Sequence, residues 1–173
     1  MFVGLAAAVG AGQVRAQEPV PRAAGFEVQV YPAGQIGAVR LDVPLQRDLL
    51  LSAYAGYDRA RRGDFGRHDD ERGGGPGGGL GAALRFGRFL VGARADVWWL
   101  GIDWSDRNPV AVGTTDITVL QPTARLGYRA GLGGATLLEL SLALGAEINV
   151  RTRGPAVGEG PILLLGGAIL RRL

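Results

Sequence analysis

The feature that most constrains this chain is an unbroken alternation of side chains over residues 137–150. Every second residue is apolar, and the positions between carry two carboxylates, an amide and mostly small residues. The apolar set is Leu138, Leu140, Leu142, Leu144, Ala146, Ile148 and Val150. A period of two indicates a β-strand with one apolar face. Strands of soluble sandwiches usually span about five or six residues, whereas this one spans about 14 and is typical of a membrane-spanning β-barrel.

Seven further stretches alternate in the same way, so we expect eight strands. Long alternating strands let a closed barrel meet lipid outside while leaving no unpaired edge. The sequence therefore predicts an all-β fold, an eight-stranded antiparallel up-and-down transmembrane β-barrel. The eight stretches are residues 26–31, 36–45, 49–58, 79–87, 89–104, 117–129, 137–150 and 160–173.

The links between these stretches alternate in length. Those after the second, fourth and sixth stretches are short, and those after the third, fifth and seventh are longer and more polar, at residues 59–78, 105–116 and 152–159. Short turns on one rim and longer loops on the other are typical of an outer-membrane barrel with both chain ends in the periplasm. We expect residues 59–78 to form a mobile extracellular loop, because the glycine run 73–79 is typical of a flexible connector.

The composition fits one ordered domain rich in tight turns. Thirty glycines and nine prolines accompany 47% hydrophobic residues in a chain of 173, with a mean hydropathy of +0.13, which argues against a low-complexity chain. There is no cysteine, which excludes disulfides and thiolate metal sites. No window holds 18 apolar residues, so a membrane-spanning helix is not expected.

The charge balance and the N-terminus bear on partners and localisation. The 19 basic residues are all arginine, against 16 acids, for a net charge of +3. They are scattered rather than clustered with aromatic residues, so no nucleic-acid partner is expected. Residues 1–17 resemble a signal peptide, with an apolar stretch at 2–12 and small residues before a cleavage point. We expect a signal peptide at 1–17, a barrel at 18–173 and export to the bacterial outer membrane.

The polar face of the strands carries arginines and acids in nearly equal numbers. An eight-stranded barrel is just wide enough to be filled by side chains, and buried charges must be paired. We therefore expect a charge-paired plug that closes the barrel to ions, with a narrow gated polar path as the alternative. The candidate network is Arg40, Asp42, Arg94, Asp96, Arg125, Glu139 and Glu147, in an inward set that also holds Glu27, Asp58, Arg85, Gln121, Arg129 and Asn149.

The charged segment 67–72 is the candidate contact surface. It consists of Arg67, His68, Asp69, Asp70, Glu71 and Arg72, and His68 is the only histidine of the chain. Its arginines suit contact with a partner or with the phosphates of lipopolysaccharide. The histidine beside three acids also fits a divalent-cation site or an acid–base pair. Nothing here matches the spacing of a calcium-binding loop, so we assign no metal, no cofactor and no catalytic residue.

Three functions compete. We favour a structural or adhesion-type protein whose barrel anchors exposed loops. An outer-membrane lipid-modifying enzyme would depend on His68 and a serine, but Ser52, Ser105 and Ser141 are not closely spaced with it. A secreted lipocalin-like barrel would hold an apolar ligand, and would then have to expose its charged face to water.

Several motifs resemble a family of small, uncharacterised bacterial outer-membrane β-barrel proteins. They are DFGRHDDERGGGPG at residues 64–77, DVWWLGIDW at 96–104, VLQPTARLGY at 119–128, GAEINV at 145–150 and VGEGPILLLG at 157–166. The resemblance implies the barrel fold and no established activity. The partners to expect are outer-membrane lipid, lipopolysaccharide and the barrel assembly machinery. Such barrels usually end in an aromatic residue that this machinery reads, whereas this chain ends in Leu173.

Overall fold

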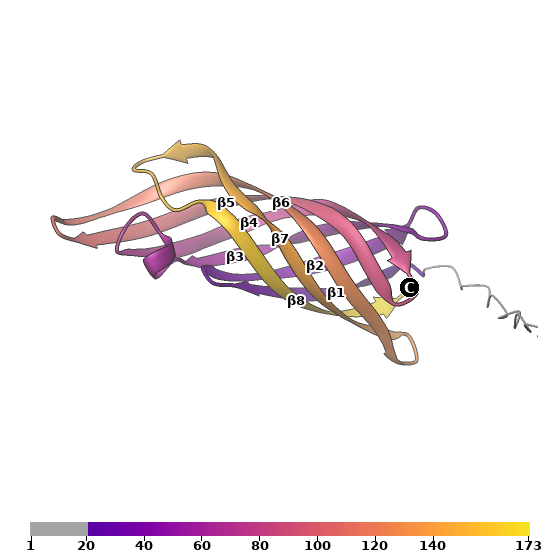
Figure 1. The fold of residues 1–173 in the computed structure, drawn as a ribbon. Coiled ribbons are helices and arrows are strands. Elements are labelled where there is room, and N and C mark those ends of the chain that lie inside the picture. The colour runs from indigo at the N-terminus through magenta and orange to yellow at the C-terminus, as the bar shows by residue number, and fades with distance from the viewer. Residues whose placement is uncertain (1–20) are drawn as a thin grey trace, which may run out of the picture.

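Eight antiparallel strands form a closed barrel in the computed structural model, which describes residues 21–173 (Figure 1). Each strand pairs with its neighbours in sequence, and β8 pairs with β1 to close the ring. The strands are β1 (Ala23–Tyr31), β2 (Gly34–Pro44), β3 (Leu49–Arg61), β4 (Asp70–Phe86), β5 (Phe89–Arg107), β6 (Val110–Gly133), β7 (Thr136–Arg153) and β8 (Gly160–Arg172), with a short 3-10 helix, η1 (Gly63–Phe65), after β3. The predicted fold class is confirmed.

The two ends of the barrel differ in their connections. One end, here called the turn end, carries the tight links 45–48, 87–88 and 134–135. The opposite hairpin end carries the links 32–33, 62–69, 108–109 and 154–159. At the turn end the backbone N–H of Leu173 donates to the carbonyl of Arg22, so both termini of the described chain lie there. The expected signal peptide at residues 1–17 lies outside the described residues.

Among residues 21–173 there is no helix with the length and apolar character needed to cross a membrane.

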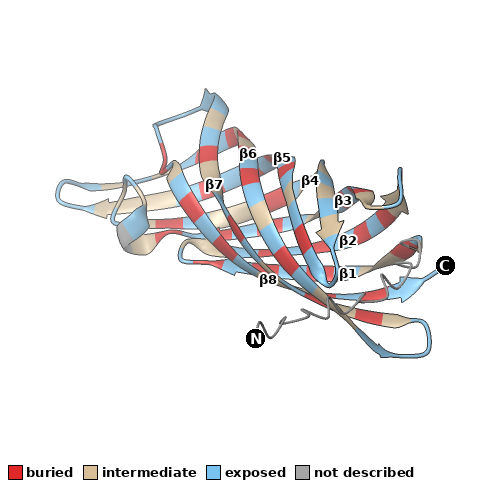
Figure 2. Ribbon diagram, turned by 45° about the vertical axis from the view of Figure 1, so that its right-hand side comes forward, coloured by how far each residue is buried: buried red, intermediate tan, exposed pale blue. Residues whose placement is uncertain are grey.

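Side chains alternate between the outside of the barrel and its lumen, as the period of a strand requires (Figure 2). On β7, Leu140 and Leu142 are exposed outside, whereas Glu139 and Glu147 are buried. All eight strands expose apolar residues, among them Phe26, Val28, Leu41, Leu51, Leu80, Leu84, Val91, Trp99, Leu126, Leu144, Leu163 and Ile169. The outward side chains thus give the barrel an apolar surface, and the side chains of the opposite face fill its lumen.

The expectation that residues 59–78 form one long mobile loop is wrong. Residues 59–61 extend β3, and the glycine run 73–79 lies in β4, between β3 and β5. The inward glycines make room for their neighbours, because a Cβ at Gly77 would collide with the Trp98 ring and one at Gly79 with the Asp96 carboxylate. The conformational freedom of glycine is overcome here by pairing with a strand on each side. Only residues 62–69 link β3 to β4.

The longer loop expected at residues 105–116 is also wrong. β5 and β6 continue as a paired hairpin as far as Arg107 and Val110, and the chain turns at residues 108–109. On this hairpin the indole N–H of Trp104 donates to Thr115 Oγ1 at 3.2 Å. The tip of the hairpin projects beyond the other strands (Figure 1). The polar residues of this segment led to the prediction of a loop. A two-stranded ribbon surrounded by solvent can nevertheless form without an apolar face.

Candidate functional site

Four arginines and four carboxylates fill the half of the lumen nearer the turn end. We call this cluster the lumen network. Its members are Glu27 on β1, Arg40 and Asp42 on β2, Arg94 and Asp96 on β5, Arg125 and Arg129 on β6, and Glu139 on β7. Equal numbers of opposite charges allow every member to have a partner, which offsets the cost of removing them from water.

Arg40 lies at the centre of the lumen network. Its Nη1 is 2.8 Å from Glu27 and 2.9 Å from Glu139, and its Nε is 2.7 Å from Asp42. These carboxylates come from three different strands, and the Arg40 side chain is 3% exposed. A guanidinium with several fixed donors is suited to such branched pairing. Arg40 therefore ties β1, β2 and β7 together across the lumen.

The other arginines share the same carboxylates. Arg125 contacts Glu27 at 3.0 Å and Glu139 at 2.8 Å, and Arg94 contacts Glu27 at 2.7 Å. Arg129 pairs with Glu139 and with Asp42, and Arg94 also pairs with Asp96. No arginine of the network depends on a single partner.

Tyr54 on β3 completes the lumen network, although it was not among the residues predicted for it. The Arg94 guanidinium lies 3.7 Å from the centre of the Tyr54 ring, and Arg125 donates to the Tyr54 hydroxyl at 2.9 Å. A desolvated cation over an aromatic face is attracted by the ring quadrupole. The signal that could have identified it is the alternation of residues 49–58, which puts Tyr54 on the same inward face as Ser52 and Asp58.

Glu147 lies outside the lumen network, so the structure joins six of the seven residues predicted for it. The Glu147 carboxylate is 3.3 Å from Arg62 Nη2, and Arg62 Nη1 is 3.5 Å from Glu71. We call Arg62, Glu71 and Glu147 the rim cluster. Between it and the lumen network lies a layer of buried apolar residues around Trp98. The members of this layer include Ile36, Trp98, Leu100, Ile102, Ile117, Val119 and Leu164.

Glu71 fixes two loops that are distant in sequence. Its Oε1 accepts the backbone N–H groups of Arg67 at 2.6 Å and His68 at 3.1 Å, and its Oε2 accepts that of Gly158 at 3.0 Å. Glu71 is fully buried. Hydrogen bonds to a carboxylate are stronger than neutral ones. Glu71 therefore holds the links 62–69 and 154–159 together at the hairpin end, and it is not available to a surface partner.

His68 is also held in place. Its Nδ1 is 2.8 Å from Asp106 Oδ2, and its ring stacks on Trp104 with the centroids 4.1 Å apart. The hydrogen bond from His68, helped by the backbone N–H of Asp69, lowers the pKa of Asp106. His68 Nε2 is buried and has no hydrogen-bond partner among the described residues. No serine hydroxyl is therefore placed against it.

In the rest of the predicted contact segment, Arg67, Asp69 and Arg72 are exposed and Asp70 is half-buried. Arg67 lies 3.5 Å from Glu159, and Arg72 pairs with Asp70 at 2.7 Å. The Asp69 carboxylate accepts the backbone N–H of Arg107 at 2.8 Å. Within residues 21–173, no group of three or more His, Cys, Asp or Glu side chains is placed to hold a metal ion.

A pocket of about 410 Å³ opens at the hairpin end beside the short β1–β2 hairpin. The pairing of β8 with β1 stops at Leu165, so residues 160–164 of β8 extend past the end of β1 and leave a notch in the wall. Phe65, Ile162 and Leu163 contribute apolar surface to this pocket, and Arg62 and Glu147 contribute charge. Its volume falls within the usual range of small-molecule sites.

Comparison with known proteins supports the architecture. Neisserial surface protein A is similar with a TM-score of 0.50 at 10% identity, over 88% of this chain and 94% of that one. The N-terminal β-barrel domain of OprF from Pseudomonas aeruginosa gives a TM-score of 0.45 at 15% identity, over 89% of this chain and 99% of the other. No protein-family model and no curated protein matches the chain. The first likeness shows the fold alone.

Replacing Glu139 by alanine should destabilise the barrel by about 3–5 kcal/mol, because it leaves buried arginines without a shared partner. Unfolding by urea of the protein folded in lipid vesicles measures the loss. The matched control is Asp116→Ala, at an exposed carboxylate, which should change stability by no more than about 0.5 kcal/mol. Equal losses from the two variants would contradict the role given to the lumen network.

Replacing Glu71 by glutamine should loosen the links 62–69 and 154–159 without unfolding the barrel. Loss of charge-assisted hydrogen bonds of about 1.5–3 kcal/mol should raise local opening roughly 10- to 100-fold. Trypsin cleavage after Arg67, followed by mass spectrometry, measures that opening. Asp70→Asn removes a carboxylate nearby that pairs only with exposed Arg72, and it should cleave at the wild-type rate. An unchanged rate in the Glu71 variant would show that the two links are held by other contacts.

Proposed function

We propose that this chain is a small bacterial outer-membrane β-barrel protein whose closed barrel anchors an ordered rim at the cell surface. The observation that carries the proposal is a lumen filled with paired charges inside a barrel coated with apolar side chains. Neither half of that arrangement suits a protein surrounded by water. The turn end would then face the periplasm and the hairpin end the outside of the cell.

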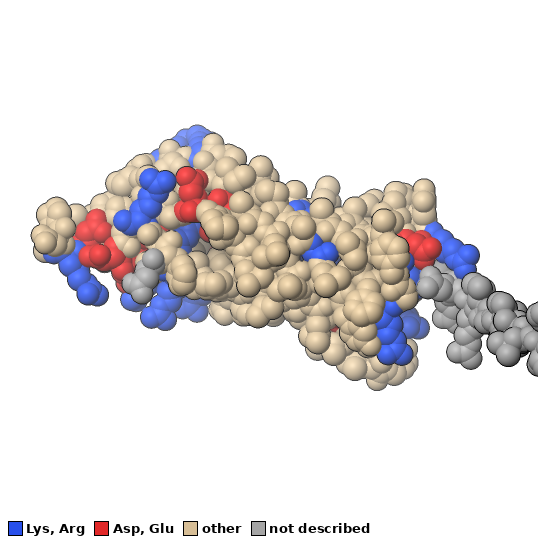
Figure 3. Space-filling view, viewed as in Figure 1, with Lys and Arg blue, Asp and Glu red and all other residues tan. Residues whose placement is uncertain are grey.

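The apolar coat supports placement in a bilayer. Space-filling shows charged side chains gathered toward the two ends, with mostly uncharged surface between them (Figure 3). Soluble monomers rarely expose contiguous apolar patches beyond a few hundred Å². A closed barrel also leaves no unpaired strand edge for lipid to meet along its length. Lipid is the surrounding that this surface fits best.

The lumen network supports a closed barrel rather than a pore. Its ion pairs bring side chains from β1, β2, β5, β6 and β7 into contact across the interior. Above it, the apolar layer around Trp98 leaves little for a hydrated ion to bind. A steady ion path would need both layers to rearrange.

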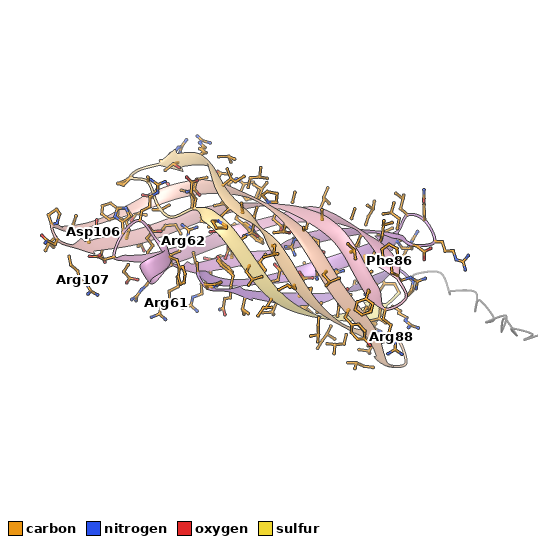
Figure 4. The ribbon with its side chains drawn as sticks, in the orientation of Figure 1. Arg61, Arg62, Phe86, Arg88, Asp106 and Arg107 are labelled. Carbon is orange, nitrogen blue, oxygen red and sulfur yellow. The ribbon has the colours of Figure 1, made fainter. Side chains whose placement is uncertain are left out.

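The competing functions have less support. A lipocalin-like protein needs an apolar cavity and a polar exterior, which is the reverse of the distribution here. A lipid-modifying enzyme dependent on His68 needs a hydroxyl against the second ring nitrogen, Nε2, but no described residue forms a hydrogen bond with this buried atom. Arginines around the hairpin end, among them Arg61 and Arg107 (Figure 4), suit contact with lipopolysaccharide phosphate. Insertion would require the barrel assembly machinery as a partner.

Planar-bilayer recordings with the purified wild-type protein should show no steady conductance, because paired charges and the Trp98 layer fill the lumen. Insertion should be verified in the same preparation by heat-modifiable migration on a gel. Stable, reproducible channels from inserted wild-type protein would overturn the closed barrel and favour a gated polar path.

The membrane placement predicts opposite outcomes for two exposed apolar residues. Leu142→Arg, in the middle of the β7 alternation, should cost roughly 2–4 kcal/mol in vesicles because it puts a charge in hydrocarbon. Val110→Arg should cost less than about 0.5 kcal/mol, because Val110 is at the tip of the projecting β5–β6 hairpin. The free energy of unfolding in vesicles measures both. Similar costs at the two sites would contradict a bilayer around the barrel.

A further inference from the structure

We propose that the mouth of the barrel at the turn end is a binding site for a phosphate group. A pocket of about 180 Å³ lies there, and four of its lining residues are arginines. They are Arg85 at the end of β4, Arg88 in the β4–β5 turn, Arg129 on β6 and Arg172 at the end of β8. Among residues 21–173, no aspartate or glutamate lines the pocket. Four guanidinium groups around one recess offer many N–H donors to a bound anion.

Arg129 forms the inner wall of this pocket and has donor capacity left over. Its Nε and Nη2 are used by Glu139, and Nη2 also by Asp42. Its Nη1 is buried and has no hydrogen-bond partner among the described residues, and the side chain as a whole is 90% buried. A buried donor without an acceptor costs free energy, so an anion that reached Nη1 would gain a hydrogen bond that the described residues do not supply. The lumen network thus ends at the mouth in an arginine that is paired with two carboxylates and still has one donor atom without an acceptor.

The remaining arginines are positioned by exposed partners. Arg88 lies at the turn end (Figure 4) and donates to the Tyr128 hydroxyl at 3.1 Å. Arg85 forms an ion pair with Asp48 at 3.6 Å, and Asp48 itself does not line the pocket. The backbone N–H of Arg172 donates to the carbonyl of Ala135, which fixes the chain at the mouth. Arg85 and Arg129 are thus paired with carboxylates, whereas the positive charge of Arg88 and Arg172 is available to an anion.

The chemistry of the pocket selects phosphate. Guanidinium groups bind phosphate oxygens through paired N–H donors, and several of them can share one phosphate. The pocket is smaller than the usual range for drug-sized ligands, which begins at about 300 Å³. The pocket is also lined by Leu90, Leu137 and Pro21, which contribute a small apolar surface. The phosphate can come from an anionic phospholipid headgroup or from free phosphate.

The lipid source rests on the proposed function, because only a membrane-spanning barrel brings the turn end level with the headgroups of the periplasmic leaflet. The chemistry of the site does not depend on that placement. Binding to the purified protein in uncharged detergent micelles therefore tests the site separately from the membrane.

The test compares the wild type with the double variant Arg88→Gln and Arg172→Gln, which leaves Arg129 and the lumen network intact. The matched control, Arg61→Gln with Arg107→Gln, removes two charges from the hairpin end. Calorimetry in phosphate-free buffer measures binding of inorganic phosphate, and native mass spectrometry measures retention of phosphatidylglycerol. We expect the mouth variant to lose at least tenfold in affinity, and the control to bind as the wild type does. Heat-modifiable migration verifies that all three are folded.

Each outcome bears on the proposal. Competition between phosphate and phosphatidylglycerol supports one site that takes a lipid headgroup, and binding of phosphate alone supports the same site with a free anion. Binding of neither probe by the folded wild type overturns the proposal, and so does an equal loss in the mouth variant and the control. Failure of the wild type to insert into vesicles, with phosphate binding intact, would overturn the proposed function and leave the site standing.

Discussion

Closure of the sheet is the constraint on which the rest of this structure depends. A closed ring of eight strands removes the exposed edges, but it also sets a lumen only about as wide as its own side chains. Every charge on an inward position must then find its partner inside the same narrow space. Arg40, with carboxylates from three strands around it, shows how that requirement is met. The lumen network is the consequence of closing the ring with charges on its inner face.

The strands contribute different amounts of side-chain volume to the lumen. The glycine run of β4 offers little side-chain volume, and Trp98 of the neighbouring β5 occupies the room that it leaves. Protein interiors are close-packed, so a glycine-rich strand must lie beside a strand whose large inward side chains fill the remaining volume. The apolar layer around Trp98 separates the lumen network from the rim cluster. In the closed barrel proposed above, the paired charges and this apolar layer block ions by different means.

The strands and the faces of their side chains could be predicted from the sequence, because alternation depends only on backbone geometry. Neighbouring Trp98 and Trp99, one buried and one exposed, follow it directly. The glycine run was misjudged, since composition reports conformational freedom but not pairing partners. The role of Glu71 was equally hidden, because its partners come from loops whose meeting depends on the finished barrel. The periodic features of the structure could therefore be predicted from the sequence, whereas contacts between segments that are distant in the sequence could not.

The span of the lumen network along the chain has a consequence for assembly. Arg40 and Glu139 are 99 residues apart, and Arg94 and Glu27 are 67 apart. In a partly formed sheet, the early arginines have no carboxylate from β7 beside them and cannot enter hydrocarbon without severe cost. In the membrane placement proposed above, incomplete barrels are disfavoured, because only the closed ring pairs all the charges of the lumen network. The same ion pairs that fill the lumen therefore also favour completion of the barrel.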